Sequence, residues 1–146
     1  MTVVAEILKS KPDAVVHRIA PTDTVYEGLR LMADKGIGAL LVMEGDAIVG
    51  IVTERDYARK IALKGLASGS TLLTDVMTPK LYVVSPRQTV QECMGIMNQA
   101  KIRHLPVVVD GAVVGLVSIG DLVNATMAEQ EFLISQLGLY ISGGMR

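Results

Sequence analysis

The fold is decided by two short stretches, GIVTERD at residues 50–56 and GLVSIGD at residues 115–121. Each contains a glycine, two aliphatic residues, a hydroxyl residue, two variable positions and an aspartate. They lie 65 positions apart in a chain of 146 residues. Two copies of one pattern at a fixed offset indicate an internal duplication, which sets the architecture before any single residue is considered.

The duplication extends upstream of both stretches. Residues 21–56 align with residues 86–121 without a gap, and 13 of the 36 aligned pairs are identical. Each copy begins with a segment that ends at a proline. Proline disfavours a helical conformation in the residue before it, so this segment is predicted to be extended. A Thr-x-x-Glu capping box and apolar residues at helical spacing then predict a helix, and two apolar runs around a turn predict a hairpin. A second helix is predicted to begin at Thr53 in one copy and at Ser118 in the other.

We therefore predict an α+β fold made of tandem β-α-β-β-α repeats, which bury their apolar sheet faces against each other as a pseudo-twofold pair. The expected limits are residues 10–68 for the first domain, 77–133 for the second and 134–146 for a C-terminal helical tail. An apolar stripe in the last helix either docks on a second copy of the chain, giving a homodimer, or packs within the chain. The stripe consists of Val123, Met127, Ile134 and Leu137, with Phe132 and Tyr140 nearby.

The composition argues against several classes of protein. The net charge is −1 and aromatic residues make up 3% of the chain, which does not suit a nucleic-acid-binding surface. No apolar run approaches the ~20 residues of a membrane-spanning helix, and the N-terminus lacks the pattern of a signal peptide. We therefore expect a soluble, cytoplasmic protein. Cys93, the single cysteine, excludes an internal disulfide and a cysteine-based metal cluster, and its place on an apolar helical face predicts a role in the core.

Thr53-x-x-Asp56 and Ser118-x-x-Asp121, called here the first and the second motif, have two interpretations. As helix caps, the hydroxyl and the carboxylate satisfy free N–H groups in the first turn of the following helix. As ligand contacts, they stand where a helix N-terminus offers N–H groups to a phosphate. An ionised carboxylate can also accept hydrogen bonds from two adjacent hydroxyls, such as the 2′/3′ diol of ribose. One side chain can fulfil both roles.

The duplicated unit, its G-h-h-[TS]-x-x-D ending and the RHLPV segment at residues 103–107 resemble the cystathionine-β-synthase (CBS) domain pair, of the stand-alone bacterial type. The resemblance covers about residues 10–133. It implies two clefts between the repeats that bind AMP, ADP, ATP, S-adenosylmethionine or, in some members, NAD(H). It also implies that Asp56 and Asp121 hold a ribose, while Thr53 and Ser118 contact a phosphate or a ribose.

The two copies differ beside the aspartates, so their ligand sites are expected to differ. Arg55 carries a guanidinium suited to phosphate, whereas Gly120 at the same place allows close approach to the backbone. The strand before the hairpin differs as well, with Gly38 and Ala39 in the first repeat and Arg103 and His104 in the second.

This strand lines the ligand in CBS pairs, so the resemblance implies that Arg103 and His104 contact phosphates; otherwise Arg103 is a solvated charge at the start of a strand. We hypothesise that one cleft takes a mononucleotide and the other a dinucleotide such as NAD(H). The adenine is expected against the first extended strand of each repeat. Further candidate contacts are Lys11, Ala14 and Val16 for the first motif, and Leu105, Pro106, Lys80 and Tyr82 for the second.

The favoured function is a regulatory, signal-transduction module that senses AMP, ATP or NAD(H) and relays its state to a regulated partner protein. An enzyme would need a reactive constellation, and the sequence contains none of the common nucleophile, metalloprotease or phosphate-loop motifs. We therefore expect no catalysis, no catalytic cofactor and no metal. The alternative is a protein-interaction or dimerisation module with non-functional ligand clefts.

Overall fold

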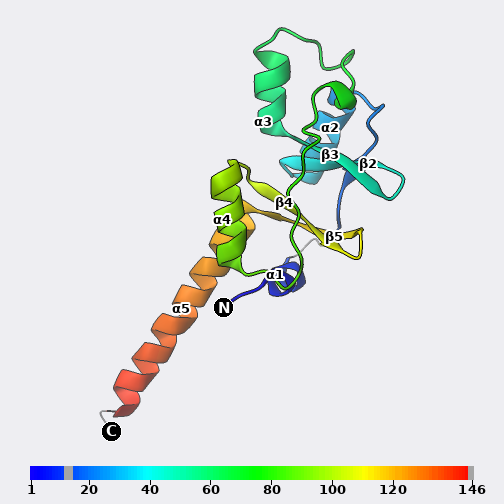
Figure 1. Ribbon diagram of the computed structural model, residues 1–146. Helices are drawn as coiled ribbons and strands as arrows, with labels where there is room; N and C mark the ends of the chain where they lie inside the picture. The colour runs from blue at the N-terminus through cyan, green and yellow to red at the C-terminus, as the bar shows by residue number, and fades with distance from the viewer. Residues whose placement is uncertain (12–14, 145–146) are drawn as a thin grey trace. The chain divides into compact units, whose positions relative to one another are not determined.

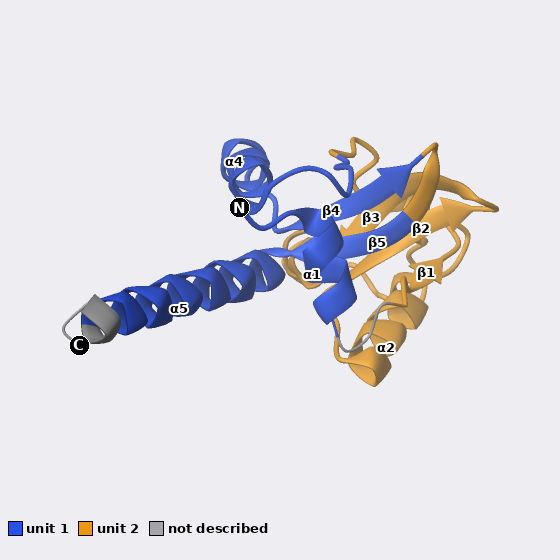
Figure 2. Cartoon of the chain, turned by 90° about the horizontal axis from the view of Figure 1, so that it is seen from below, with its two compact units in different colours: residues 1–14, 83–109, 114–146 blue, residues 15–82, 110–113 orange. Residues whose placement is uncertain are grey.

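The computed structural model describes residues 1–11 and 15–144 and divides into two compact units (Figure 1). Unit 1 comprises residues 1–14, 83–109 and 114–146, and unit 2 comprises residues 15–82 and 110–113 (Figure 2). Helices and strands alternate in both units, which confirms the predicted α+β class.

Unit 2 contains the first repeat in the predicted β-α-β-β-α order. Its sheet has the order β1-β2-β3, with β1 parallel to β2 and β3 antiparallel to it. The crossover from β1 to β2 runs through α2, as a parallel strand pair requires. The elements are β1 (Arg18–Ile19), α2 (Val25–Lys35), β2 (Ala39–Glu44), β3 (Ala47–Thr53), α3 (Glu54–Asp56), the π-helical η1 (Tyr57–Ala62) and the 3-10 turn η2 (Leu73–Asp75).

Local signals explain these boundaries. The Thr24 Oγ1 accepts a hydrogen bond from the backbone N–H of Glu27 at 3.2 Å and so caps α2. The helix ends at Gly36, whose φ of 64° suits a residue without a Cβ. Gly45, with a φ of 58°, turns the chain between β2 and β3. The buried core of the unit consists of Val25, Met32, Leu40, Val42, Val52, Ile61, Leu73 and Val76.

Unit 1 contains the second repeat. The strand equivalent to β1 is reduced to one parallel bridge between Val84 and Val107, so the sheet consists of β4 and β5. The capping box of Thr89 and Glu92 is complete, since each side chain accepts from the backbone N–H of the other residue. The elements are α1 (Val4–Ser10), α4 (Val90–Ala100), β4 (His104–Val109), β5 (Ala112–Ser118) and α5 (Ile119–Gly144).

The helix α1 was not predicted, because seven residues are too few to form a stable helix without tertiary packing. It belongs to the unit of the second repeat, where Val4 and Ile7 lie in the buried core. The N–H of Val4 donates to the carbonyl of Gln88 at 2.9 Å, which fixes the helix start. The other buried core residues of unit 1 are Val84, Val90, Cys93, Met97, Leu105, Val107, Val117 and Leu122.

The predicted C-terminal helix is present as the distal part of α5, which extends beyond the rest of its unit (Figure 1). Ten large apolar side chains of α5 are exposed: Ile119, Val123, Met127, Phe132, Leu133, Ile134, Leu137, Leu139, Tyr140 and Ile141. Packing within the described chain therefore does not cover the stripe predicted from the sequence.

Candidate functional site

The first motif forms a complete capping box at the start of α3. The backbone N–H of Thr53 donates to Asp56 Oδ2 at 2.9 Å, and the N–H of Asp56 donates to Thr53 Oγ1 at 3.1 Å. The hydroxyl of Thr53 also donates to Asp56 Oδ2, at 3.2 Å. Interpretation as a helix cap is therefore correct, and the cap fixes the rotamer of the aspartate.

Lys60 neutralises the first aspartate from one turn further along the same helical segment. Its Nζ lies 3.2 Å from Asp56 Oδ1. The same ammonium donates to the carbonyl of Val76 at 2.8 Å and contacts the hydroxyl of Thr78 at 3.4 Å. The ammonium therefore makes two hydrogen bonds and an ion pair within its own unit.

The second motif forms the same box at the start of α5. The N–H of Ser118 donates to Asp121 Oδ2 at 2.8 Å, and the N–H of Asp121 donates to Ser118 Oγ at 3.1 Å. In both repeats the first N–H of the helix also donates to the strand before the hairpin. The N–H of Glu54 reaches the carbonyl of Gly38 at 3.1 Å, and that of Ile119 reaches the carbonyl of Arg103 at 2.9 Å.

Lys11 pairs with the second motif, although the sequence analysis grouped it with the first. Its Nζ donates to Asp121 Oδ2 at 3.0 Å and to the carbonyl of Leu116 at 2.8 Å. The reason for the difference is tertiary, because the N-terminal segment that ends in Lys11 packs on the second repeat. Of the other first-strand candidates, Val16 is half-buried, and Ala14 lies outside the described residues.

The two residues at the start of β2 and of β4, one just before each strand and one within it, differ between the repeats. Arg103 is exposed and His104 is half-buried beside Asp121. Burial lowers the pKa of His104, and the charges of Lys11 and Arg103 lower it further, while the Asp121 carboxylate acts in the opposite direction. The imidazole is therefore held neutral to lower pH than an ordinary histidine. In the first repeat the corresponding Gly38 is half-buried and Ala39 is buried.

The other ligand contacts predicted for the two motifs differ in burial and in the unit to which they belong. The side chains of Leu105 and Pro106 are fully buried, so a ligand could reach these residues only through the main chain. Gly120 and Arg55 are both exposed at the start of their helices. Lys80 lies over the ring of Tyr82, 5.7 Å from its centroid, and both residues belong to unit 2. The structure therefore does not bring them into the unit of the second motif.

A cavity of about 210 Å³ adjoins the second motif. It lies between the C-terminal end of α1 and the first turns of α5. Sequence reasoning had singled out two of its lining residues, Lys11 and Asp121, and missed the polar Ser10 and Asn124, which carry no motif. The remaining lining residues are Ile7, Ala125 and Ala128.

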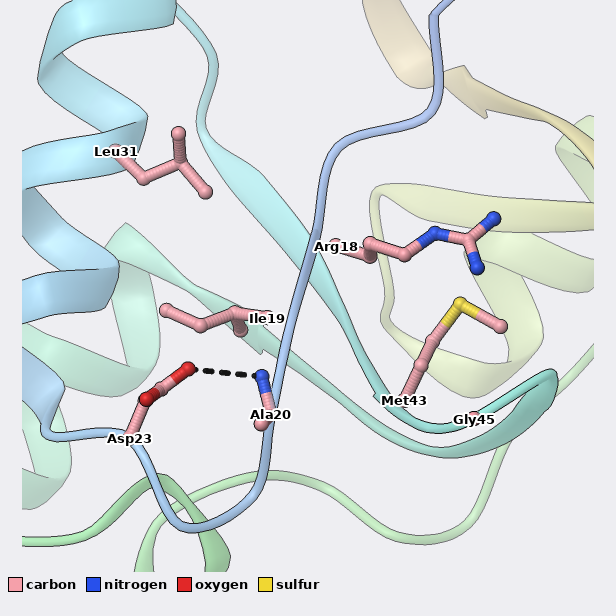
Figure 3. A pocket seen from close by; sticks show the side chains of 7 residues that line it. All are labelled: Arg18, Ile19, Ala20, Asp23, Leu31, Met43 and Gly45. Atoms are coloured by element: carbon pink, nitrogen blue, oxygen red, sulfur yellow. Dashed lines mark hydrogen bonds between the residues drawn. The ribbon is translucent and has the colours of Figure 1, made fainter.

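A second cavity, of about 460 Å³, lies in unit 2 (Figure 3). Met43 and Gly45 of its lining are at the hairpin end of β2, whereas Thr53 pairs with Ala39 at the opposite end of that strand. It is therefore separate from the first motif. Its other lining residues are Arg18, Ile19, Ala20, Asp23 and Leu31, and the Asp23 carboxylate accepts from the N–H of Ala20 at 3.1 Å.

Other functional chemistry is sparse in the described part of the chain. Residues 1–11 and 15–144 contain no group of three or more histidine, cysteine or acidic side chains placed to hold a metal ion. None of their helices combines the length and apolar character needed to cross a membrane. Cys93 is buried in the core as predicted, and burial raises the pKa of its thiol, with a smaller contribution from Glu92. A neutral buried thiol of this kind is unreactive.

Comparison with known proteins identifies the repeat. The CBS domain matches the chain twice, over residues 4–63 and 73–128. The mitochondrial CBS domain-containing protein CBSX3 of Arabidopsis thaliana is 40% identical over 151 residues, covering 98% of this chain and 73% of that protein. A CBS-domain protein from Burkholderia ambifaria, provisionally assigned to signal transduction, has 50% identity and a TM-score of 0.85, covering 88% of this chain and 96% of that one.

A third similarity concerns the fold alone. The CBS domain pair of protein MJ0100, solved in complex with 5′-methylthioadenosine and S-adenosyl-L-methionine, is 24% identical with a TM-score of 0.76. The alignment covers 88% of this chain and 98% of that one. The family predicted from the duplicated motif is thus confirmed, and the chain belongs to the CBS-domain family as a tandem pair, a regulatory type of module.

Proposed function

We propose that this CBS pair is a regulatory module that binds AMP, ADP or ATP, and NAD(H) at one of its sites, and relays the bound state to a partner protein. The observation that carries the proposal is the pair of equivalent carboxylates, Asp56 and Asp121, each fixed by a capping box at a helix start. Both remain partly accessible, with 15% and 20% of their side chains exposed.

The capping geometry supports ligand binding as well as local structure. The box holds each carboxylate in one orientation, so little side-chain entropy is lost when a ribose diol binds. A carboxylate has about four lone-pair sites, and the cap engages only part of them. The adjacent helix N-terminus favours a negatively charged phosphate.

The difference between the repeats supports unequal ligands. Arg103 and His104 place cationic or hydrogen-bonding groups beside the second motif, which suits the phosphate of a mononucleotide. At the corresponding place in the first repeat, a Cβ on Gly38 would lie no closer than 3.9 Å to its nearest neighbour, Glu54. We assign the dinucleotide NAD(H) to this less crowded first site.

A CBS pair of the same fold binds two adenosine-containing ligands, 5′-methylthioadenosine and S-adenosyl-L-methionine. This observation supports an adenosine compound as the ligand class here. The alternative is an interaction module whose ligand sites do not function. The cytoplasmic location expected from the sequence is part of the proposal, as is the absence of catalysis.

The direct test combines detection of a co-purified nucleotide with titration. The chain has no tryptophan and four tyrosines, so its own absorbance at 280 nm is weak and a bound adenine would raise the 260/280 ratio visibly. Released nucleotide is identified by mass spectrometry, which also shows whether it is chemically unchanged. Asp56→Ala and Asp121→Ala should each weaken one binding event by about tenfold or more in calorimetry.

The matched control is Asp34→Ala, which removes an exposed carboxylate from α2. Unchanged binding in both motif variants would refute the site assignment. If the wild-type chain bound no adenosine compound at millimolar concentration, the interaction-module alternative would be correct. Simple competition between AMP and NADH for one site would contradict the assignment of unequal ligands.

For the partner, we propose that α5 docks on a second copy of the chain through a seam of side chains within residues 123–141. Its exposed side chains recur at alternating spacings of four and three residues, with Gln130 as the one polar member. Ile134 and Ile141 share one seam position and Leu137 stands at the other, and such a combination favours a two-stranded helix pair. The seam consists of Val123, Met127, Gln130, Ile134, Leu137 and Ile141.

Light scattering after size exclusion tests this dimer. The double variant Ile134→Glu, Leu137→Glu places charges in the seam and should give a monomer. Gln136→Glu adds a charge to the same helix outside the seam and should leave the mass unchanged. A wild-type chain that is monomeric at 100-fold different concentrations would exclude self-association through α5.

A further inference from the structure

The second motif has hydrogen-bonding capacity that the folded chain does not use. Asp121 Oδ2 accepts from Ser118 and from Lys11, whereas Oδ1 accepts no hydrogen bond from the described residues. The ammonium of Lys11 has three N–H donors, of which two are engaged by Asp121 and by the carbonyl of Leu116. A free acceptor and a free donor therefore stand next to each other.

The first motif lacks this combination. Asp56 Oδ1 already pairs with Lys60, and Asp56 Oδ2 accepts twice from Thr53. Lys60 donates to the carbonyl of Val76 and to the hydroxyl of Thr78, and its ammonium also forms the ion pair with Asp56 Oδ1. A ligand at the first motif would therefore approach a carboxylate oxygen that already has a cation 3.2 Å away.

The free groups of the second motif adjoin a cavity of suitable size and character. Both Lys11 and Asp121 line the cavity of about 210 Å³, together with the polar side chains of Ser10 and Asn124. Its volume is below the ~300–1,000 Å³ typical of sites that enclose a whole small ligand. It is therefore suited to one polar part of a ligand, with the remainder outside.

We propose that Lys11 is a ligand-binding residue of the second motif that recognises a ribose cis-diol jointly with Asp121. The 3′-hydroxyl donates to Asp121 Oδ1, and the neighbouring 2′-hydroxyl accepts from the third N–H of Lys11. This inference rests on the proposed function and adds a specificity to it. The second motif selects ribonucleotides over 2′-deoxyribonucleotides, and Lys11 is the residue that makes this choice.

The selectivity follows from what a deoxy ligand would leave unsatisfied. Lys11 and Asp121 are only 26% and 20% exposed, so water replaces a missing hydroxyl incompletely. A site built to hydrogen-bond a hydroxyl rejects the analogue that lacks it, because its own polar group is left without a partner. If Lys11 contacted the phosphate instead, its substitution would weaken the binding of ribo and deoxy ligands equally.

The test is the ratio of the affinities of the full chain for AMP and for 2′-deoxy-AMP, measured by calorimetry. In the wild type the ratio for the second site should be about tenfold or more in favour of AMP. Lys11→Gln is the informative variant, because its two amide N–H groups can still bond Leu116 and Asp121 and leave no donor for the ligand. Its ratio should fall to about twofold or less.

Two further variants separate binding from structure. Lys9→Gln makes the same charge change at an exposed position of α1 and should keep the wild-type ratio. Lys11→Arg restores a cation with spare donors and should recover part of the selectivity. A general loosening of α1 would lower both affinities and leave their ratio unchanged, so a folding defect does not imitate the expected result.

The outcomes distinguish this inference from the function on which it rests. If the wild type binds AMP and Lys11→Gln retains the full preference over 2′-deoxy-AMP, the role of Lys11 is wrong and the proposed function stands. An equal loss of affinity for both ligands likewise overturns it, in favour of a phosphate or structural role. If the wild type binds neither ligand at millimolar concentration, the proposed function fails and the inference falls with it.

Discussion

The two repeats hold an aspartate in the same capping box, yet each aspartate meets a lysine from a different part of the chain. Lys60 is four residues beyond Asp56 on the same helical segment, so this pair forms wherever the helix forms. Lys11 is 110 residues away from Asp121 and reaches it only when α1 packs on the second repeat. The duplicated segments themselves are alike. The two motifs differ because the N-terminal segment supplies a lysine to the second motif, whereas the lysine of the first motif comes from its own helical segment.

The strands that precede the two motifs, β3 and β5, also differ in the donor that one backbone carbonyl meets. The carbonyl of Ile51 in β3 accepts from the backbone N–H of Thr78 at 2.9 Å. The equivalent carbonyl in β5, that of Leu116, accepts from the Lys11 ammonium at 2.8 Å. A backbone donor in the first repeat is thus replaced by a side-chain donor in the second.

The largest expected effect is a loss of stability on truncating a core leucine that both repeats share. Leu40 and Leu105 occupy equivalent positions, and both side chains are fully buried in the cores of their units. Leu40→Ala and Leu105→Ala should each lower the free energy of unfolding by about 3 kcal/mol, through lost burial and a residual cavity. Urea denaturation measures both, with the exposed Leu63→Ala as control. If the two losses of unfolding free energy differed by more than twofold, the two cores would not be equivalent.

A smaller effect should separate the repeats at a shared glycine. A Cβ on Gly50 would lie 2.7 Å from Met77 Sδ and 3.1 Å from the carbonyl oxygen of Thr78. A Cβ on Gly115 would lie 2.6 Å from the methyl end of Leu8, which can rotate away. Gly50→Ala should therefore cost about 2 kcal/mol and Gly115→Ala about 1 kcal/mol in the same denaturation assay. The reverse order would mean that α1 is held more rigidly than the segment at Thr78.

The smallest effect is a pH dependence confined to the second repeat. The folded state lowers the pKa of His104, so the unfolded chain binds a proton more readily. Stability is therefore highest above the ordinary histidine pKa of 6.5, declines as the pH falls through that value, and levels off below the lowered pKa. His104→Gln should flatten this part of a melting-temperature profile. An unchanged profile in the variant would assign the pH dependence to other groups.

The repeat order and the caps could be predicted because they depend on local sequence. A Thr-x-x-Glu or Ser-x-x-Asp pattern closes hydrogen bonds between residues three apart, so no distant partner is needed. The same is true of the alternation of helix and hairpin, which follows the spacing of apolar residues. Family membership followed from finding these local patterns twice at one offset.

The placement of Lys11 could not be predicted, because it depends on a contact between the ends of the chain. The sequence by itself determined the duplicated unit and its capped aspartates, although the first strand of the second repeat is reduced to one bridge. Tertiary structure alone decided that α1 joins the second repeat, that Val4 and Ile7 complete its core, and that Lys11 meets Asp121. The physical reason is that burying two apolar side chains stabilises a helix too short to persist alone, and Lys11, the residue that follows the helix, is thereby brought to the motif.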